Sequence, residues 1–495
     1  MGFVGMSQAA IAQSFSLSGV DFSESAYLEA ATLSEVAGDY TNKPISFSDL
    51  QQMVERINAL YAASGVVTAR AILPPQEIRN GRLRVELVEA TVDQVSIEGL
   101  DRTDPEFLRR SIVIEQGALP DFEALERELR LFEIAHGMRP TLAFAPGSQT
   151  GTTSAILRAE EPERYEITGS IDNFGSVATG ELRGSLFGQM NSVTGALDTL
   201  SGQLQVTEGA ASGSLGYSRP IGARGGRISA SVVVANSNVI AGPFEAVDIV
   251  SDSASGTLGY AMPFWVGPQS HWGVELSYGY EDNTSSLDGL DFADVNLQEL
   301  VVLASYQRLL PTYSVAARVG FKSGRAESSE VSETEGDYMM LFGSVSYAKE
   351  FSETAILSAD MNFQLAPDEN LPAARLFNAG GALSLRGYPN AVRSGDSGFI
   401  ARVQVSPKRE YDMPGYEPGL LSPFGFADFG MVVPFREDGS IDADQDYLAS
   451  LGLGVRGEFS ESASGVIMIA VPMIDTLGFD DSGSAVGYIG LDYNF

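Results

Sequence analysis

The feature that most constrains this chain is a long series of short segments in which apolar and polar residues alternate. In the first of them, Tyr165, Ile167, Gly169 and Ile171 fall on one face of an extended strand, because successive side chains point to opposite faces. The segments are about ten residues long, as a tilted membrane strand requires, and no helical pattern interrupts them. We therefore predict that residues 163–495 form an antiparallel transmembrane β-barrel rather than a soluble sandwich.

We expect sixteen strands in this barrel, and they lie near residues 165, 181, 199, 211, 227, 254, 272, 297, 313, 338, 354, 398, 422, 447, 464 and 485. Tight connections at 310–312 and 351–353 contrast with longer, acidic ones at 281–296 and 324–337. Short periplasmic turns and longer external loops alternate in this way in membrane barrels. The long segment 366–397 is the eleventh connection, so it is external if the chain enters the barrel from the periplasm.

The composition fits a membrane barrel and excludes several other classes of protein. The formal net charge of -34 argues against a nucleic-acid binder, because phosphate contacts need clustered Lys and Arg. The absence of cysteine excludes disulfide scaffolds, thiol catalysis and cysteine-bearing zinc sites. The 53 Gly, 26 Phe and 18 Tyr are typical of outer-membrane strands, and no run of about 18 apolar residues predicts a membrane-spanning helix.

The N-terminus predicts the end of a secretory signal peptide. Residues 1–13 are mostly small and apolar, and Ala10-Ile11-Ala12 matches the A-x-A pattern of a cleavage site. No basic segment precedes the apolar run, so we expect residues 1–12 to be a residual signal peptide whose beginning is missing from this sequence. The alternative is an unstructured N-terminus.

Residues 14–162 carry one order of strands and helices twice. The first copy, 14–90, has its elements at 14–22 (strand), 24–37 and 46–64 (helices, the second capped by Ser46), and 66–73 and 82–89 (strands). The second copy, 91–162, repeats this order at 92–97, 104–114, 121–136, 141–145 and 152–159. The repeat predicts two small α+β modules.

Two short stretches offer charges of opposite sign. The first is Leu385, Arg386, Gly387 and Tyr388, and the second contains Phe426, Asp428 and Gly430 on one face of a strand. If the other face of this strand meets lipid, Asp428 faces the lumen of the barrel. A carboxylate is costly there unless an opposite charge such as Arg386 reaches it, so we expect the two residues to form an ion pair.

Aromatic residues mark the ends of predicted strands. Trp265 and Trp272 flank a predicted inner turn, which fits an interfacial aromatic belt. The chain ends in an alternating run, 487–495, with Tyr493 and Phe495 as its last aromatic residues. This ending resembles the assembly signal of outer-membrane barrels.

These features together resemble the two-partner secretion transporters, the TpsB family of haemolysin-activator and filamentous-haemagglutinin-exporter type. The segment GVVTARAILPPQEIRNGRLRVELVEATVDQVSIEG is similar to the first POTRA domain of that family, and the resemblance covers roughly residues 15 to 495. It implies two POTRA domains followed by a 16-stranded antiparallel transmembrane β-barrel. It also implies that Arg386 belongs to a loop tip that tucks into the barrel, where Phe426, Asp428 and Gly430 hold it.

The resemblance implies a function as well as a fold. The POTRA domains would lie in the periplasm of a Gram-negative bacterium and capture an unfolded exoprotein by strand addition to a sheet edge, for which 66–73 is the candidate. The outer-membrane barrel would then export the exoprotein. The implied partners are this exoprotein, the barrel-assembly machinery, periplasmic chaperones and outer-membrane lipid, with no nucleic acid and no cofactor. The alternatives are a factor that inserts other barrels and a diffusion porin. If cleavage follows Ala12, no room is left for the N-terminal plug helix of many members, so we expect no plug-based gating.

Motifs that imitate enzyme sites are weak. Residues 395–398, Gly-Asp-Ser-Gly, imitate a serine-protease fragment, but His136 falls in a predicted helix and His271 in a predicted barrel strand, so no triad is evident. Residues 452–457 match G-x-G-x-x-G without a following helix. Two histidines and no cysteine also leave no metal-ligand spacing. We therefore expect neither an enzyme nor a metal site.

Overall fold

The computed structural model describes residues 14–242, 245–328, 335–366, 370–413, 419–435, 446–476, 479 and 481–495. The expected signal peptide, and with it the question of a plug helix, lies outside these residues. The described chain forms two compact units. The first runs to Glu161, except that Arg102–Asp104 and Ile134–Gly137 group with the second. Among the described helices, none is long and apolar enough to cross a membrane.

The first unit repeats one α+β topology. Its first copy contains β1 (Phe15–Ser16), β2 (Gly19–Phe22), α1 (Ala30–Gly38), β3 (Pro44–Ile45), α2 (Phe47–Ala63), β4 (Ala69–Ile72) and β5 (Arg82–Glu89). Its second copy contains β6 (Thr91–Glu98), α3 (Pro105–Ser111), α4 (Phe122–His136), β7 (Pro140–Pro146) and β8 (Thr152–Ala159). In each three-stranded sheet the last strand is central. Strand β5 is parallel to β2 and antiparallel to β4, and β8 is parallel to β6 and antiparallel to β7, which gives the orders β2-β5-β4 and β6-β8-β7.

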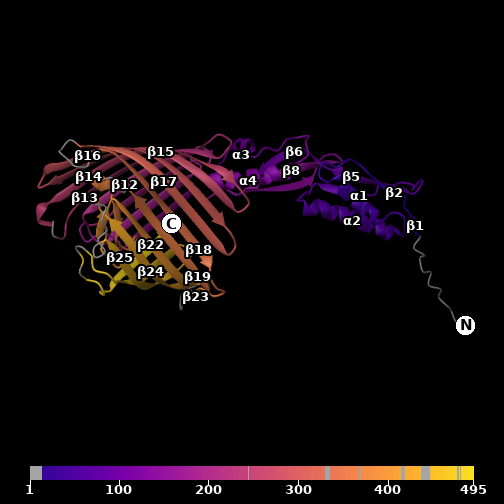
Figure 1. Ribbon diagram of the computed structural model, residues 1–495. Helices are drawn as coiled ribbons and strands as arrows, with labels where there is room; N and C mark the ends of the chain where they lie inside the picture. Colours follow the sequence, from indigo (N-terminus) through magenta and orange to yellow (C-terminus); the bar gives the residue numbers. More distant parts are fainter. Residues whose placement is uncertain are drawn as a thin grey trace. The chain divides into compact units, whose positions relative to one another are not determined.

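A local contact sets the start of α2, and a distant one sets the start of α1. Helix α2 starts after Ser46, whose hydroxyl accepts the Asp49 N–H while the Asp49 carboxylate accepts the Ser46 N–H, a reciprocal capping box. Helix α1 starts at Ala30, later than the sequence predicted. The reason is that the Ser25 hydroxyl and the Ala26 N–H bind the Glu89 carboxylate, which holds the preceding residues in a turn. Figure 1 shows both helices on one side of β5.

Strand β4 lies at an edge of its sheet. Among the described strands it pairs only with β5, and it is shorter than the predicted strand 66–73. Val67 just before it is 71% exposed, and Ile72 at its end is 38% exposed. An edge of this kind can accept another extended chain, because its outer N–H and C=O groups are not used within the sheet.

A carboxylate holds the turn between β7 and β8. Asp93, at a bulge in β6, accepts hydrogen bonds from the Ser148 N–H at 2.7 Å and the Ser148 hydroxyl at 2.8 Å. The hydroxyls of Thr152 and Ser154 also bind it, at 3.2 and 3.1 Å. These bonds, that of the Ser148 N–H first, lower the pKa of Asp93 to about 2.

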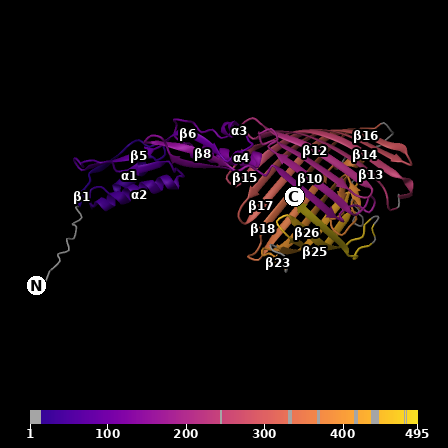
Figure 2. The same ribbon diagram turned by 180° about the vertical axis from the view of Figure 1, so that it is seen from behind.

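The second unit is a closed antiparallel barrel of sixteen long strands, as predicted. The strands are β9 (Tyr165–Asp172), β10 (Arg183–Asn191), β11 (Thr199–Val206), β12 (Ala210–Ile221), β13 (Gly226–Asn238), β14 (Ile249–Val266), β15 (Ser270–Leu287), β16 (Leu290–Leu309), β17 (Tyr313–Ser328), β18 (Gly336–Glu350), β19 (Ala355–Leu365), β22 (Ser397–Pro407), β24 (Leu420–Val433), β25 (Tyr447–Glu458), β26 (Ala463–Pro472) and β27 (Val486–Asn494). The two-residue strand β23 (Tyr411–Asp412) extends the β22–β24 hairpin. Figure 2 shows the C-terminus beside β10 and β26, where β27 closes the barrel against β9.

Two connections that the sequence predicted as long loops are largely strand. Strands β15 and β16 stay paired out to Leu287 and Leu290, and Asp288 and Gly289 turn the chain with positive φ angles of 51° and 75°. Strands β17 and β18 likewise reach Ser328 and Gly336, respectively, on either side of their connection. The outer ends of β15 and β17 are mostly polar, so apolar residues do not alternate there. Pairing between the strands still satisfies the backbone.

Aromatic side chains line the inner-turn ends of β14 to β18. Trp265 and Trp272 are register partners, 48% and 41% exposed. The Trp272 ring lies 4.6 Å from that of Tyr306, and Tyr313 and Tyr347 follow on the next two strands with ring centroids 6.4 Å apart. The row agrees with the predicted interfacial belt.

The Asp93 bonds lead to a pH prediction. A depressed carboxyl pKa stabilises the fold above the unfolded pKa, about 3.9, and this stabilisation is lost as the pH falls towards 2. At pH 6, Asp93→Ala should raise the hydrogen-exchange rate of the Ser148 amide several-fold. Lowering the pH from 5 to 2 should reduce the difference in the Ser148 exchange rate between this variant and the wild type, after correction for the pH dependence of intrinsic exchange. Glu115→Ala, at an exposed site of the same module, is the control, and equal exchange in both variants would contradict the assignment.

Candidate functional site

Strand β24 presents one of its two faces to the interior of the barrel. Phe424, Phe426 and Asp428 on that face are buried, whereas the next residue, Phe429, is 41% exposed on the outer face. Asp428 is 2% exposed. The alternation predicted from the sequence therefore places a carboxylate on the lumenal side of the wall.

The long connection between β19 and β22 folds back into the interior. It contains a short helical turn, η2 (Ala373–Arg375), and a two-stranded ribbon of β20 (Phe377–Ala379) and β21 (Arg393–Gly395). The loop tip, Leu385–Tyr388, lies between these two strands, and all four of its residues are buried. We call the connection, residues 366–397, the long loop.

Arg386 and Asp428 form the predicted ion pair. The Asp428 carboxylate accepts Arg386 Nε at 2.7 Å, Nη2 at 2.6 Å and the Arg386 backbone N–H at 3.1 Å. The two side chains are 8% and 0% exposed. The guanidinium also stacks on the Phe426 ring, 3.4 Å from its centroid. A forked, charge-assisted pair of this kind is strong because both donors point at one carboxylate.

The other residues of the loop tip each have a partner on the wall. Leu385 fills the space left by Gly430, where an added Cβ would lie 2.7 Å from Leu385 Cδ1. The Gly387 N–H donates to the Tyr488 hydroxyl of β27 at 2.9 Å. Gly387 has φ 95°, a value that disfavours any side chain, and an added Cβ would lie 3.1 Å from the backbone N of Pro472.

Tyr388 anchors the far end of the loop tip. Its hydroxyl lies 2.9 Å from the Ala449 carbonyl and 2.8 Å from that of Ile474, and its ring packs on Phe479 with centroids 5.2 Å apart. The two sequence motifs thus meet, and the loop tip binds β24, β25 and β27 together.

The sequence did not reveal two further arginines, Arg375 and Arg393, whose ion pairs hold the long loop. Arg375 in η2 binds Glu299 of β16 at 2.5 Å and Glu281 of β15 at 2.7 Å. Lys322 and Tyr338 also bind Glu299, at 3.1 and 2.6 Å. Acidic residues on lumenal strand positions were the available signal, but pairing them requires the fold.

Arg393, the second of these arginines, lies near the end of the loop. Arg393 binds Asp446 at 3.0 Å, and their side chains are 8% and 0% exposed. Neighbouring Asp396 accepts the backbone N–H groups of Leu371 and Phe435, at 2.7 and 2.6 Å. The Ser397 hydroxyl accepts the Ala366 N–H. Asp396 and Ser397 of the serine-protease-like segment therefore hold the backbone of the long loop and its surroundings.

The C-terminal residues close the barrel. Phe495 donates its N–H to the Ile167 carbonyl, and the Tyr493 and Phe495 rings meet edge to face, 4.9 Å apart. The ladder between β27 and β9 contains five residue pairs, whereas β15 and β16 share eighteen. No group of three or more possible metal-ligating side chains occurs in the described residues.

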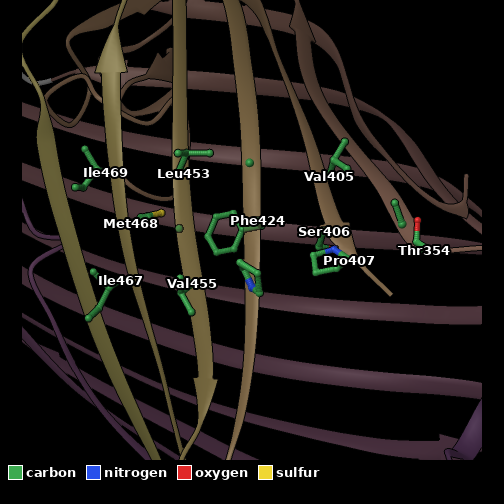
Figure 3. Close-up of a pocket in the computed structure, with 14 residues that line it drawn as sticks. Thr354, Val405, Ser406, Pro407, Phe424, Leu453, Val455, Ile467, Met468 and Ile469 are labelled. Atoms are coloured by element: carbon green, nitrogen blue, oxygen red, sulfur yellow. The ribbon is translucent and has the colours of Figure 1, made fainter. Parts of the chain in front are cut away.

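A hollow of about 770 Å³ lies on the outer face of the wall, away from the loop tip. Pro423 and Gly425 are among the residues that line it, together with exposed side chains such as Val405, Leu453 and Ile467 (Figure 3). This apolar surface faces lipid in a membrane barrel, so it does not belong to the lumenal site.

Comparisons with known proteins agree with this geometry. Residues 151–457, more than half of the 495-residue chain, match the family described as haemolysin secretion/activation protein ShlB/FhaC/HecB. Residues 15–90 match the POTRA domain, ShlB-type.

Individual relatives are distant in sequence, and they differ in how much of the chain they cover. The heme/hemopexin transporter protein HuxB of Haemophilus influenzae is 20% identical over 89% of this chain and 80% of its own length. The outer membrane transporter CdiB of Dickeya dadantii is 25% identical over 38% of this chain and 32% of its own length.

Solved structures share the fold. CdiB from Escherichia coli has a TM-score of 0.71 at 17% identity and covers 100% of this chain and 93% of its own. BamA from Haemophilus ducreyi, lacking POTRA domains 1-3, has a TM-score of 0.60 at 13% identity over 98% of this chain and 100% of its own. With the family match over the barrel and the POTRA match before it, this chain belongs to the ShlB/FhaC/HecB family of outer-membrane transporters, which export secreted exoproteins.

Proposed function

We propose that the long loop controls export by this transporter, and that the Arg386–Asp428 pair holds the loop in the barrel between export events. The observation that carries this proposal is the burial of both charges, with three hydrogen bonds from one arginine to one carboxylate. A loop packed against the inner face of the wall narrows the lumen, so an extended client needs the loop tip to move.

We further propose how the client reaches the barrel. The module of residues 14–90 captures the unfolded exoprotein through the edge of β4, where Val67 and Ile72 offer exposed apolar side chains. Residues 91–162 form the second periplasmic module, and 163–495 form the barrel. A signal peptide at 1–12, periplasmic chaperones and the barrel-assembly machinery would bring the chain to the outer membrane, with Tyr493 and Phe495 as its assembly signal.

A role in inserting other barrels is the weaker alternative. Its support is the likeness to BamA, which at 13% identity concerns the fold alone. The family match and the transporter relatives favour export.

Removal of the first module should separate capture from assembly. Deletion of residues 14–90 should abolish export of the exoprotein, while the barrel still reaches the outer membrane in heat-modifiable form, because its strands satisfy their own backbone. Secretion into the medium and a gel-shift assay of unheated samples measure the two effects. Normal export by the shortened chain would refute the capture role.

Breaking the ion pair should release the loop tip. Arg386→Ala or Asp428→Ala should weaken the seated loop by about 3 to 5 kcal/mol, because each leaves a buried charge unpaired. Export should fall in both variants, and the double alanine variant should lose little more than either single one. Exchanging the charges (Arg386→Asp with Asp428→Arg) should rescue export only in part, since the forked geometry is lost.

A cysteine introduced at position 384 reports whether the long loop is seated. The Ser384 hydroxyl is buried without a hydrogen-bond partner in the described chain, and the protein contains no cysteine. Ser384→Cys should therefore react slowly with a thiol reagent in the wild type and quickly in the pair variants. Equal reactivity, or strictly additive losses of export, would show that the pair does not hold the loop.

A further inference from the structure

Asp428 has an arginine beside it that it does not use in this structure. Arg402 of β22 is its register partner across the ladder, and both side chains face the lumen, as Ile400 and Phe426 on the same strands do. Opposite residues of an antiparallel pair have Cβ atoms about 4.5–5.5 Å apart, so an arginine side chain reaches across without backbone movement. Arg402 Nη1 instead donates to the carbonyl of Leu383 in the long loop, at 2.8 Å.

The register partner of Asp428 on the opposite strand neighbour, Ser450, also has a hydroxyl that is not used in the described chain. Ser450 of β25 is the second register partner of Asp428 and is 1% exposed, yet its hydroxyl has no hydrogen-bond partner among the described residues. Buried hydroxyls normally have a partner. The hydrogen bonds that Asp428 accepts in the described chain all come from Arg386, while two other donors stand beside it.

We infer that Arg402 positions the Asp428 carboxylate once the loop tip has left the wall, which we call the withdrawn state. When the loop tip leaves, Arg402 takes the place of Arg386 on the Asp428 carboxylate, and Ser450 supplies a second donor. One movement frees both partners, because Asp428 loses the three bonds from Arg386 and Arg402 loses the Leu383 carbonyl. A buried carboxylate without a counter-charge is costly, so this exchange makes the withdrawn state accessible. The inference rests on the proposed gating by the long loop.

Two other charged groups face this part of the wall. Asp360 of β19 is the register partner of Arg402 on its other side, and its carboxylate accepts the Ser346 hydroxyl at 2.8 Å. Arg456 of β25 stacks on the Phe424 ring, 4.8 Å from the centroid. Asp360 is thus the competing partner for Arg402, and the experiment must separate it from Asp428.

Conductance of the full-length protein in a planar lipid bilayer tests the exchange, with the open state taken as the withdrawn loop. Arg402→Met keeps the length of the side chain but removes its charge and donors. It should lower the ratio of open to closed time roughly tenfold, because the ion pair with the Asp428 carboxylate that is lost in the open state outweighs the single bond to the Leu383 carbonyl that is lost in the closed state. Arg402→Lys should restore much of the ratio. Arg318→Met removes a lumen-side arginine that pairs with Glu275 on another part of the wall, and it should leave the ratio unchanged.

The unfolding temperature provides a second test of the exchange of partners on Asp428. In the Arg386→Ala variant the unpaired Asp428 drives the loop tip off the wall, and Arg402 then neutralises the carboxylate, so Arg402→Met should lower the unfolding temperature more in that background than in the wild type. Additive losses, or unchanged open times in Arg402→Met, would overturn the inference. An effect of Asp360→Asn on open times equal to that of Arg402→Met would assign the arginine to Asp360 and overturn it as well.

The outcomes also separate this inference from the proposed function. If Arg386→Ala changes neither the conductance nor the reactivity of a cysteine at position 384, the loop tip does not gate the barrel, and both proposals fail. If Arg386→Ala opens the barrel but Arg402→Met has no effect, gating by the loop stands and the exchange of partners fails alone.

Discussion

The burial of the Asp428 carboxylate is the constraint on which the lumenal arrangement depends. A charge that is 2% exposed needs a fixed counter-charge, and Arg386 supplies it from the long loop. Every other contact of the loop tip follows from this placement. Leu385 can enter only because Gly430 has no side chain, and Gly387 can approach Pro472 only because it lacks one itself.

Much of the barrel could be predicted because strand alternation is a local signal. The number of strands, the lumenal face of β24 and the pairing of Arg386 with Asp428 all follow from period-two patterns and from the cost of a buried charge. The ribbon of β15 and β16 beyond the apolar belt was missed for the same reason. Polar and charged residues occupy both faces of β15 from Glu281 to Ser286, so the pattern on that strand ends before the strand does.

The contacts of Arg375 and Arg393 could not be predicted, because their partners are set by register around the barrel. Glu299 and Asp446 are distant from them in sequence, and nothing local distinguishes these acids from those in exposed loops. Helix α1 is a smaller case of the same kind. Its start depends on Glu89, a residue in another strand, which ties down Ala26.

The long loop is held at separate places on the wall. Its base binds β16 through Arg375, and its tip binds β24 through Arg386, with β17, β18, β19 and β22 between these two strands. Rupture of the tip contact leaves the base contact intact. Because the two ends of the loop also continue into β19 and β22, a tip that has left its seat stays close to the wall and can return without a search through solution.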